Sequence, residues 1–253
     1  MKRLPSIPSK KGQVSDEEWG ARLELAAAYR LLAHHSMTHL INSHITLRVP
    51  GTKDQFLINP YGPLFEQITA SCLVKIDANG AVLEDTPYAI NRAGFIIHGA
   101  IHLGRPDLHC VIHTHTAAGM AVSALDCGIL PLNQGAQRFY NRVGYHDHEG
   151  VSHDLDERSR LVRDLGQNKV MILKNHGLIA CGIDVAEAFY MIYHLEKTCQ
   201  AQLMVLAANT PYSFPPPDVC EKTAQQFENM ALGQREWPAL LTLVEELYPS
   251  FAQ

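Results

Sequence analysis

The feature that most constrains this chain is a pair of histidines, His113 and His115, in residues 110–116 (CVIHTHT). The β-branched residues before the pair favour a strand. On a strand, side chains two apart lie on the same face, with Cβ atoms about 6–7 Å from each other. Both imidazoles can then reach one metal ion. On a helix, the same spacing would turn the two rings about 200° apart.

A histidine pair with this spacing is weak evidence on its own. The chain has 14 histidines, and a second pair occurs at His146 and His148. With so many histidines, pairs of this kind also arise by chance, and short motifs carry a high risk of false positives. The metal hypothesis therefore depends on a third ligand.

His176 is the candidate third ligand. It lies between two apolar runs, residues 169–174 and 177–181, that are typical of strands. We expect a tight turn between them, with positive φ at Gly177. A histidine in such a turn has little packing value. Three imidazoles with an open position are characteristic of a catalytic metal site rather than a structural one.

Composition narrows the class of protein. The 253 residues are 46% hydrophobic and 19% charged, as in an ordinary globular chain, and suit one large domain or two small ones. The net charge of -5 and the lack of a long basic run argue against a nucleic-acid partner. No run of 18 apolar residues is present, so we expect no membrane span.

The cysteines and the N-terminal residues predict the cellular compartment of the protein. The six cysteines show no paired spacing, which indicates a reducing compartment and predicts a cytoplasmic protein. Residues 1–11 are basic without an apolar core, so they do not form a secretory signal. We expect a flexible tail over 1–14, one domain over 15–210, and a helical extension over 211–253 that packs on the domain or on a neighbouring subunit.

Hydrophobic periodicity and turn residues predict an α/β fold. Ser15 and Glu18 form a capping box at the start of the first helix. Strands separated only by turns, one of them the hairpin signal Asn79-Gly80, favour antiparallel pairing. We expect strands within 40–49, 56–59, 71–77, 81–84, 110–116, 169–174 and 177–181, and helices near 16–36, 90–104, 117–125, 155–165, 185–208, 218–231 and 236–248.

Two further groups of residues are weaker indications of a functional site than the histidine pair at 113 and 115. His98 and His102 lie four apart on the second helix, and we interpret them as core or interface histidines rather than ligands. Residues 127–154 look irregular, and their second half predicts a polar loop near a site. A solvated surface loop is the alternative.

Six short segments occur in an order that resembles the class II aldolase/adducin superfamily, over about residues 20–210. The sequences of these segments are most similar to those of the adducin-head-like branch. The segments are 43–51 (SHITLRVPG), 56–62 (FLINPYG), 68–71 (ITAS), 105–107 (RPD), 113–115 (HTH) and 175–178 (NHGL).

This resemblance implies a three-layer α/β/α domain with a central, mainly antiparallel β-sheet. It implies a divalent metal, usually Zn²⁺ with Fe²⁺ or Mn²⁺ as alternatives, on ligands that carry over as His113, His115 and His176. Family enzymes are typically homotetramers with the site near a subunit interface. They cleave or epimerise sugar phosphates through a metal-bound enediolate.

The chain departs from the pattern of these aldolases at three places. They carry an acid/base carboxylate four residues before the histidine that matches His98, and this chain has Gly94 there. Their phosphate-holding hydroxyl pair is replaced by Arg92 and Ala93. A Gly-Asn pair becomes Ser43-His44. The usual aldol mechanism therefore lacks its base.

These departures shape the predicted site. Substrate-binding candidates are His44, Asn59, Gly62 and Arg92. A guanidinium at a helix start favours a small anionic substrate, such as an oxo- or hydroxy-acid, although a surface pair between Arg92 and Asp85 is the alternative. The acid/base is expected from the loop or from a neighbouring subunit, with Glu149 first and Tyr140 and His148 next.

Three functions remain open from the sequence. The first is a metal-dependent, lyase-like enzyme acting on a small carbonyl or hydroxy compound. The second is a non-catalytic adducin-like interaction module of the actin-cytoskeleton type. The third is a non-haem iron oxygenase on the same fold. Gly94 fits either the interaction module or a different chemistry, whereas three histidines favour an enzyme.

Overall fold

A seven-stranded sheet forms the centre of the molecule. The computed structural model describes residues 5, 7–150 and 156–253, without the side chains of Arg92 and Ala93. The strand order is β3-β2-β1-β4-β7-β6-β5, and only β5 and β6 pair in parallel. This confirms an α/β fold with a mainly antiparallel sheet. The strands are β1 His44–Arg48, β2 Gln55–Ile58, β3 Val74–Asp77, β4 Cys110–Thr114, β5 Val143–His146, β6 Val170–Leu173 and β7 Gly177–Gly182.

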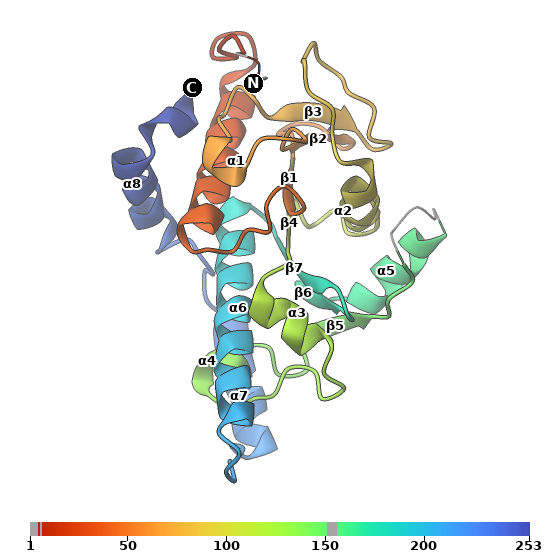
Figure 1. Cartoon of the computed structure of the whole chain (residues 1–253), viewed down its shortest axis with the longest axis vertical. Coiled ribbons are helices and arrows are strands. Elements are labelled where there is room, and N and C mark those ends of the chain that lie inside the picture. The colour runs from red at the N-terminus through yellow and green to blue at the C-terminus, as the bar shows by residue number, and fades with distance from the viewer. Residues whose placement is uncertain (1–4, 6, 151–155) are drawn as a thin grey trace.

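Helices cover both faces of the sheet. Figure 1 shows α1, α6 and α8 on one side and α2 and α5 on the other, which gives three layers. The helices are α1 Asp16–His34, α2 Arg92–Gly104, α3 Ala117–Ser123, α4 Gln134–Gln137, α5 Glu157–Leu165, α6 Val185–Ala207, α7 Pro217–Glu228 and α8 Trp237–Leu247, with 3₁₀ turns η1 Phe65–Gln67 and η2 Pro249–Ala252.

Strand alternation divides the core into two sides. On β4, Ile112 packs in the core under α1 and α6, whereas Val111 packs in the core under α2 and α5. Because side chains two apart share a face, His113 lies on the α2 side with Val111. The register places His113 directly opposite His44 on β1. The pattern of the sheet thus directs both imidazoles toward α2.

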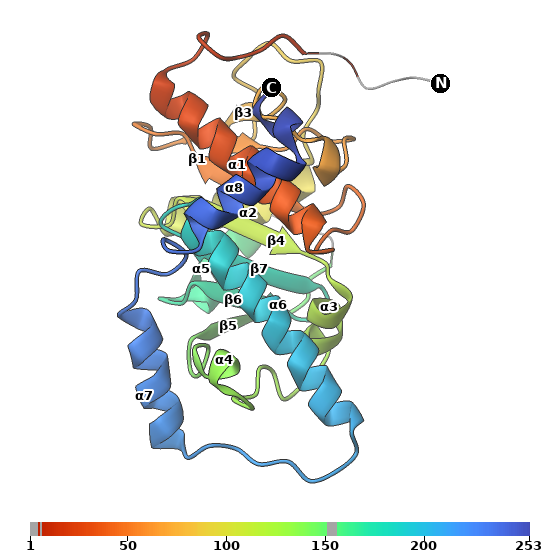
Figure 2. The same cartoon turned by 90° about the vertical axis from the view of Figure 1, so that its left-hand side faces the viewer.

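The C-terminal helices contact different parts of the domain. α8 and η2 pack against α1, whereas α7 packs against α4. Figure 2 shows α7 running along the lower half of the molecule after a long connection from α6. Near the other terminus, the backbone N–H of Lys10 donates to Ser71 Oγ. No helix of the described residues is long and apolar enough to cross a membrane.

Local predictions differ from the structure in three informative places, two of which are small. Ser15 does cap α1 by accepting from the N–H of Glu18, but the Glu18 carboxylate pairs with Arg22 and Lys75 instead of reaching back. The Asn79-Gly80 turn forms, with Gly80 at φ +77°, yet the following segment makes only a bridge from Val82 to Ile76.

The third difference is larger. Part of the segment predicted to be an irregular loop is the edge strand β5, which pairs in parallel with β6. The strand contains a glycine, Gly144. The structure shows why glycine is needed there, since a Cβ would lie 2.5 Å from the carbonyl oxygen of Asp164 on α5.

Candidate metal centre

Three histidines from separate segments converge at one end of the sheet. His113 lies on β4, His115 follows the last residue of that strand, and His176 lies in the turn between β6 and β7. Each offers a ring nitrogen, and these nitrogens all lie within 4.8 Å of one another. The Nε2 atoms of His115 and His176 are 2.9 Å apart. One ion can therefore contact all three rings.

The hydrogen bonds and burial of these rings fit a metal centre. His113 Nδ1 donates to the carbonyl oxygen of Leu178 at 2.9 Å, which leaves its Nε2 as a lone pair. Burial holds the pKa of His113 well below its usual value and lowers the pKa of His115 to about 4. Neutral imidazoles with free lone pairs are the form that binds divalent metals.

The turn that carries His176 is held by a close backbone approach. The residue with positive φ is Asn175, at +57°, and not Gly177 as the sequence suggested. Gly177 is required for another reason: a Cβ there would lie 2.5 Å from the carbonyl oxygen of Thr114 and 3.0 Å from His115 Cδ2. Only glycine lets the start of β7 pack against the end of β4.

The segment after His115 is fixed by a buried carboxylate. Thr116 caps α3 by accepting from the N–H of Gly119, and its hydroxyl donates to the carboxylate of Glu196 on α6. Both Thr116 and Glu196 are buried. This pair holds the backbone of His115 between the end of the strand and the start of the helix.

The converging rings open into a cavity of about 310 Å³. Five imidazoles and two amides line it, and none of the described residues that line it is acidic. The described part of this surface therefore offers hydrogen-bond donors and lone pairs without a negative charge. The lining residues are Asn42, His44, Asn91, Gly94, Ile97, His113, His115, His148, Gly150 and His176.

His44 fills the space beside Gly94. A Cβ on Gly94 would lie 2.2 Å from Cε1 and 2.4 Å from Nε2 of the His44 ring. The His44 side chain is buried, and neither of its ring nitrogens has a hydrogen-bond partner among the described residues. The two departures from the aldolase pattern at Gly94 and His44 therefore belong to one packing arrangement. The His44 imidazole takes the volume that a side chain at position 94 would need.

A buried chain of hydrogen bonds that includes Thr46, His98 and His102 lies next to His44. The Thr46 hydroxyl contacts His98 Nδ1 at 2.8 Å and His102 Nε2 at 2.7 Å, and His102 Nδ1 contacts the Leu108 carbonyl oxygen at 3.3 Å. His102 also stacks on Phe56. These two histidines are core residues, as expected, but His98 Nε2 has no described partner and its ring centre lies 4.7 Å from that of His44.

Comparison with known proteins identifies the family. A family model described as the Class II Aldolase and Adducin N-terminal domain matches residues 23–203. The chain belongs to the class II aldolase and adducin family.

Solved structures of this family share the whole fold. A crystal structure of an aldolase II superfamily protein from Pseudomonas syringae is 44% identical, covers 96% of this chain and 99% of that chain, and has a TM-score of 0.92. The L-fuculose 1-phosphate aldolase from Glaciozyma antarctica PI12 is 27% identical, covers 99% of this chain and 97% of that chain, and has a TM-score of 0.85.

The adducin side of the family is equally similar over a shorter span. Rat (Rattus norvegicus) alpha-adducin is 43% identical over 190 residues. The match covers 74% of this chain but only 26% of alpha-adducin. Similarity to adducin therefore concerns the domain that carries the histidine centre.

Within this class II aldolase and adducin domain, the three acid/base candidates lie in different environments. His148 lines the histidine cavity, with its ring 6.3 Å from that of His176. Glu149 forms a two-pronged ion pair with Arg160, which lowers the pKa of that carboxyl. Tyr140 lines another cavity, with Phe139 and Tyr145. Only His148 of the three reaches the histidine cavity.

The substrate candidates divide in the same way. His44 lines the cavity, whereas the Asn59 amide oxygen accepts from the Tyr29 hydroxyl at 2.9 Å inside the core. Gly62 lies in an exposed turn with φ +127°, and neither it nor Asn59 is among the lining residues. Arg92 begins α2, and its side chain lies outside the described set.

Three polar residues near the centre escaped sequence reasoning. His39 Nδ1 lies 3.4 Å from His115 Nδ1, and Asn42 and Asn91 line the cavity. Asn91 had a usable signal, because an asparagine before a helix is a common N-cap, and here it accepts from the N–H of Gly94. Nothing in the local sequence marks His39, which reaches the centre through the loop between α1 and β1.

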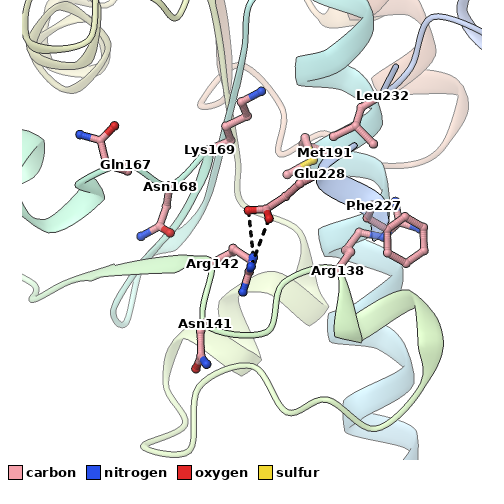
Figure 3. A pocket seen from close by; sticks show the side chains of 10 residues that line it. All are labelled: Arg138, Asn141, Arg142, Gln167, Asn168, Lys169, Met191, Phe227, Glu228 and Leu232. Carbon is pink, nitrogen blue, oxygen red and sulfur yellow. Dashed lines mark hydrogen bonds and ion pairs between the residues drawn. The ribbon is translucent and has the colours of Figure 1, made fainter. Parts of the chain in front are cut away.

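A larger cavity of about 540 Å³ lies beside α7 (Figure 3). Most of its charged side chains are paired, since Arg142 bonds Glu228 and Glu221, and Lys169 bonds Glu187. It holds no cluster of metal-binding side chains among the described residues. The smaller histidine cavity therefore remains the better candidate for chemistry.

Proposed function

We propose that this protein is a metal-dependent, lyase-type enzyme that acts on a small carbonyl or hydroxy compound. The observation that carries the proposal is the convergence of His113, His115 and His176 in a cavity. Three neutral imidazoles with room for a substrate are typical of catalytic sites, and Zn²⁺ is the ion we expect. Similarity over 99% of the chain to an L-fuculose 1-phosphate aldolase supports this class of reaction.

The chain's own residues have separate tasks in such a reaction. A divalent ion on the three histidines supplies Lewis-acid polarisation of a substrate oxygen. Leu178 orients His113 through its carbonyl. The amides of Asn42 and Asn91 can bond substrate oxygens, and Ile97 gives the cavity an apolar wall. His148 is the acid/base candidate, because its ring lines the cavity and can hold or move a proton.

The expected substrate is anionic. The absence of an acidic side chain among the described lining residues removes the repulsion that a carboxylate would exert on an anion. We therefore extend the proposal to a small oxo- or hydroxy-acid, in place of the sugar phosphate in the name of the Glaciozyma enzyme. A homotetramer with the cavity near a subunit interface belongs to the same proposal, as does a cytoplasmic location.

Metal content tests the proposal directly. The wild type should bind about one Zn²⁺ per chain, and His115→Ala should lose most of it, because two imidazoles hold an ion far more weakly than three. His109→Ala is the matched control, since His109 is an exposed histidine next to the same strand. Elemental analysis of the three dialysed proteins provides the measurement. Full occupancy in His115→Ala would refute the ligand assignment.

An adducin-like interaction module is the second candidate, favoured by the 43% identity to alpha-adducin and by Gly94. A wild type that binds neither Zn²⁺ nor Fe²⁺ would favour this module. Stoichiometric Fe²⁺ with oxygen consumption would instead indicate an oxygenase. The same elemental analysis, together with an oxygen-consumption assay, therefore separates all three functions.

A further inference from the structure

We propose that His44 contacts the substrate directly, accepting a hydrogen bond from a hydroxyl group, and that the site selects small 2-hydroxy acids. This inference rests on the proposed metal-dependent function and makes its substrate class specific. The His44 imidazole is buried and its two nitrogens have no hydrogen-bond partner among the described residues, which leaves a donor and an acceptor unsatisfied in the free protein.

The hydrogen-bond chain behind His44 defines which nitrogen is an acceptor. The Leu108 carbonyl can only accept, so His102 Nδ1 carries its proton and His102 Nε2 is a lone pair. The Thr46 hydroxyl donates to that lone pair and accepts from His98 Nδ1. The tautomers assigned in this way leave His98 Nε2 as a buried lone pair.

The lone pair of His98 favours one orientation of its neighbour. The ring centres of His98 and His44 lie 4.7 Å apart, so the buried lone pair at His98 Nε2 can attract the N–H of His44. The remaining nitrogen of His44 then presents a lone pair to the cavity. A lone pair pairs with a donor, and a hydroxyl is the donor that a small acid carries.

The cavity lining supplies the second half of the specificity. Two asparagine amides offer N–H donors beside three neutral imidazoles, and the described lining includes no carboxylate. A ligand carboxylate meets donors there and, from the described lining residues, no opposing negative charge. A molecule with a hydroxyl next to a carboxylate uses both features, with the hydroxyl toward His44.

Packing makes the assignment testable without touching the histidine. The Gly94→Ala substitution places a Cβ 2.2 Å from the His44 ring, so the ring must move out of its place. Gly99→Ala is the matched control on the same helix, because the three atoms nearest to its Cβ would all belong to the Phe95 ring, the closest at 3.2 Å. Both changes add one methyl group to α2, but only one displaces His44.

The experiment compares L-lactate with propionate, which differ by the 2-hydroxyl. Binding to the Zn²⁺-loaded proteins is measured by calorimetry, together with metal content and thermal unfolding. The wild type should prefer L-lactate, and His44→Ala and Gly94→Ala should lose about 5- to 10-fold of that preference, as expected for one hydrogen bond. Their metal content should stay at the wild-type level, and Gly99→Ala should keep the preference.

Each other result overturns the inference in a distinct way. A preference for lactate that survives in a folded, metal-loaded His44→Ala protein refutes the contact. If His44→Ala does not fold, an unchanged preference in Gly94→Ala refutes it equally. A wild type that binds Zn²⁺ but does not distinguish lactate from propionate refutes the substrate class alone. A wild type without Zn²⁺ refutes the proposed function as well.

Discussion

Replacing Gly177 by alanine is predicted to break the contact that assembles the metal centre. The added Cβ would lie 2.5 Å from the Thr114 carbonyl oxygen, about 0.9 Å closer than ordinary van der Waals contact. That oxygen belongs to the backbone at the end of β4. Thr114 pairs with Leu178 of β7 in the sheet, so the carbonyl group cannot rotate away. The φ of Gly177 does not lie in the left-handed region, so the effect is steric.

The cost follows from overpacking a buried site. Inserting a methyl group into a packed interior destabilises by about 1–3 kcal/mol, and a backbone obstacle places Gly177→Ala near the upper end. For a domain of this size, each kcal/mol lowers Tm by about 2–4 °C. Because β7 must shift away from β4, His176 moves relative to His115, and we expect at least about a tenfold loss in Zn²⁺ affinity, typical of a lost supporting contact.

Urea unfolding of the metal-free protein and competition with a chromophoric chelator measure the two effects separately. Gly20→Ala is the control, because Gly20 lies within α1 and, apart from the adjoining residues and the helix's own backbone, no described atom comes within 4 Å of the place that its added methyl group would take. Alanine there should stabilise by about 0.5–1 kcal/mol through helix propensity. If Gly177→Ala unfolds like the wild type and holds Zn²⁺ equally well, the steric account of the centre is wrong.

Two further predictions concern buried charge. Arg22→Met should lower the free energy of unfolding in urea by about 3–5 kcal/mol, because Arg22 is fully buried between the carboxylates of Glu18 and Glu84. Lys174→Ala is the control, since it breaks an exposed pair with Asp147 and should cost less than about 1 kcal/mol. Burial lowers the pKa of His102 to about 3. The unfolded chain therefore takes up a proton near pH 6.5 that the folded chain does not bind until about pH 3. The free energy of unfolding falls as the pH falls through that window. His102→Phe should flatten this fall by up to about 1.4 kcal/mol per pH unit in urea titrations, and an unchanged slope would contradict the burial argument.

Local patterns were enough to predict much of the backbone. The β-branched residues Val111 and Ile112 identified β4, and the apolar runs on either side of His176 identified β6 and β7. These signals are local, because the period of side chains along a strand or helix is set within a few residues. The spacing of His113 and His115, with His176 in a turn, also pointed to a shared centre, and the fold brings the three together.

The strand β5 shows where local pattern fails. It has only four residues and the segment around it is polar, so the sequence predicted a loop. It becomes a strand because β6 supplies parallel hydrogen bonds and α5 packs directly over Gly144. Neither partner lies within the window that a local pattern covers. The same limit applies to Glu149, whose pairing with Arg160 depends on where α5 packs.

The relation between His44 and Gly94 was settled by tertiary structure alone. In the sequence they were two separate departures from the aldolase pattern, far apart along the chain. The β1–β4 register places His44 opposite His113, and the packing of α2 on that face brings Gly94 against the imidazole ring. Backbone period is encoded locally and can be read residue by residue, whereas the occupancy of a buried volume depends on every element that borders it, so only the folded chain shows which side chain fills the space.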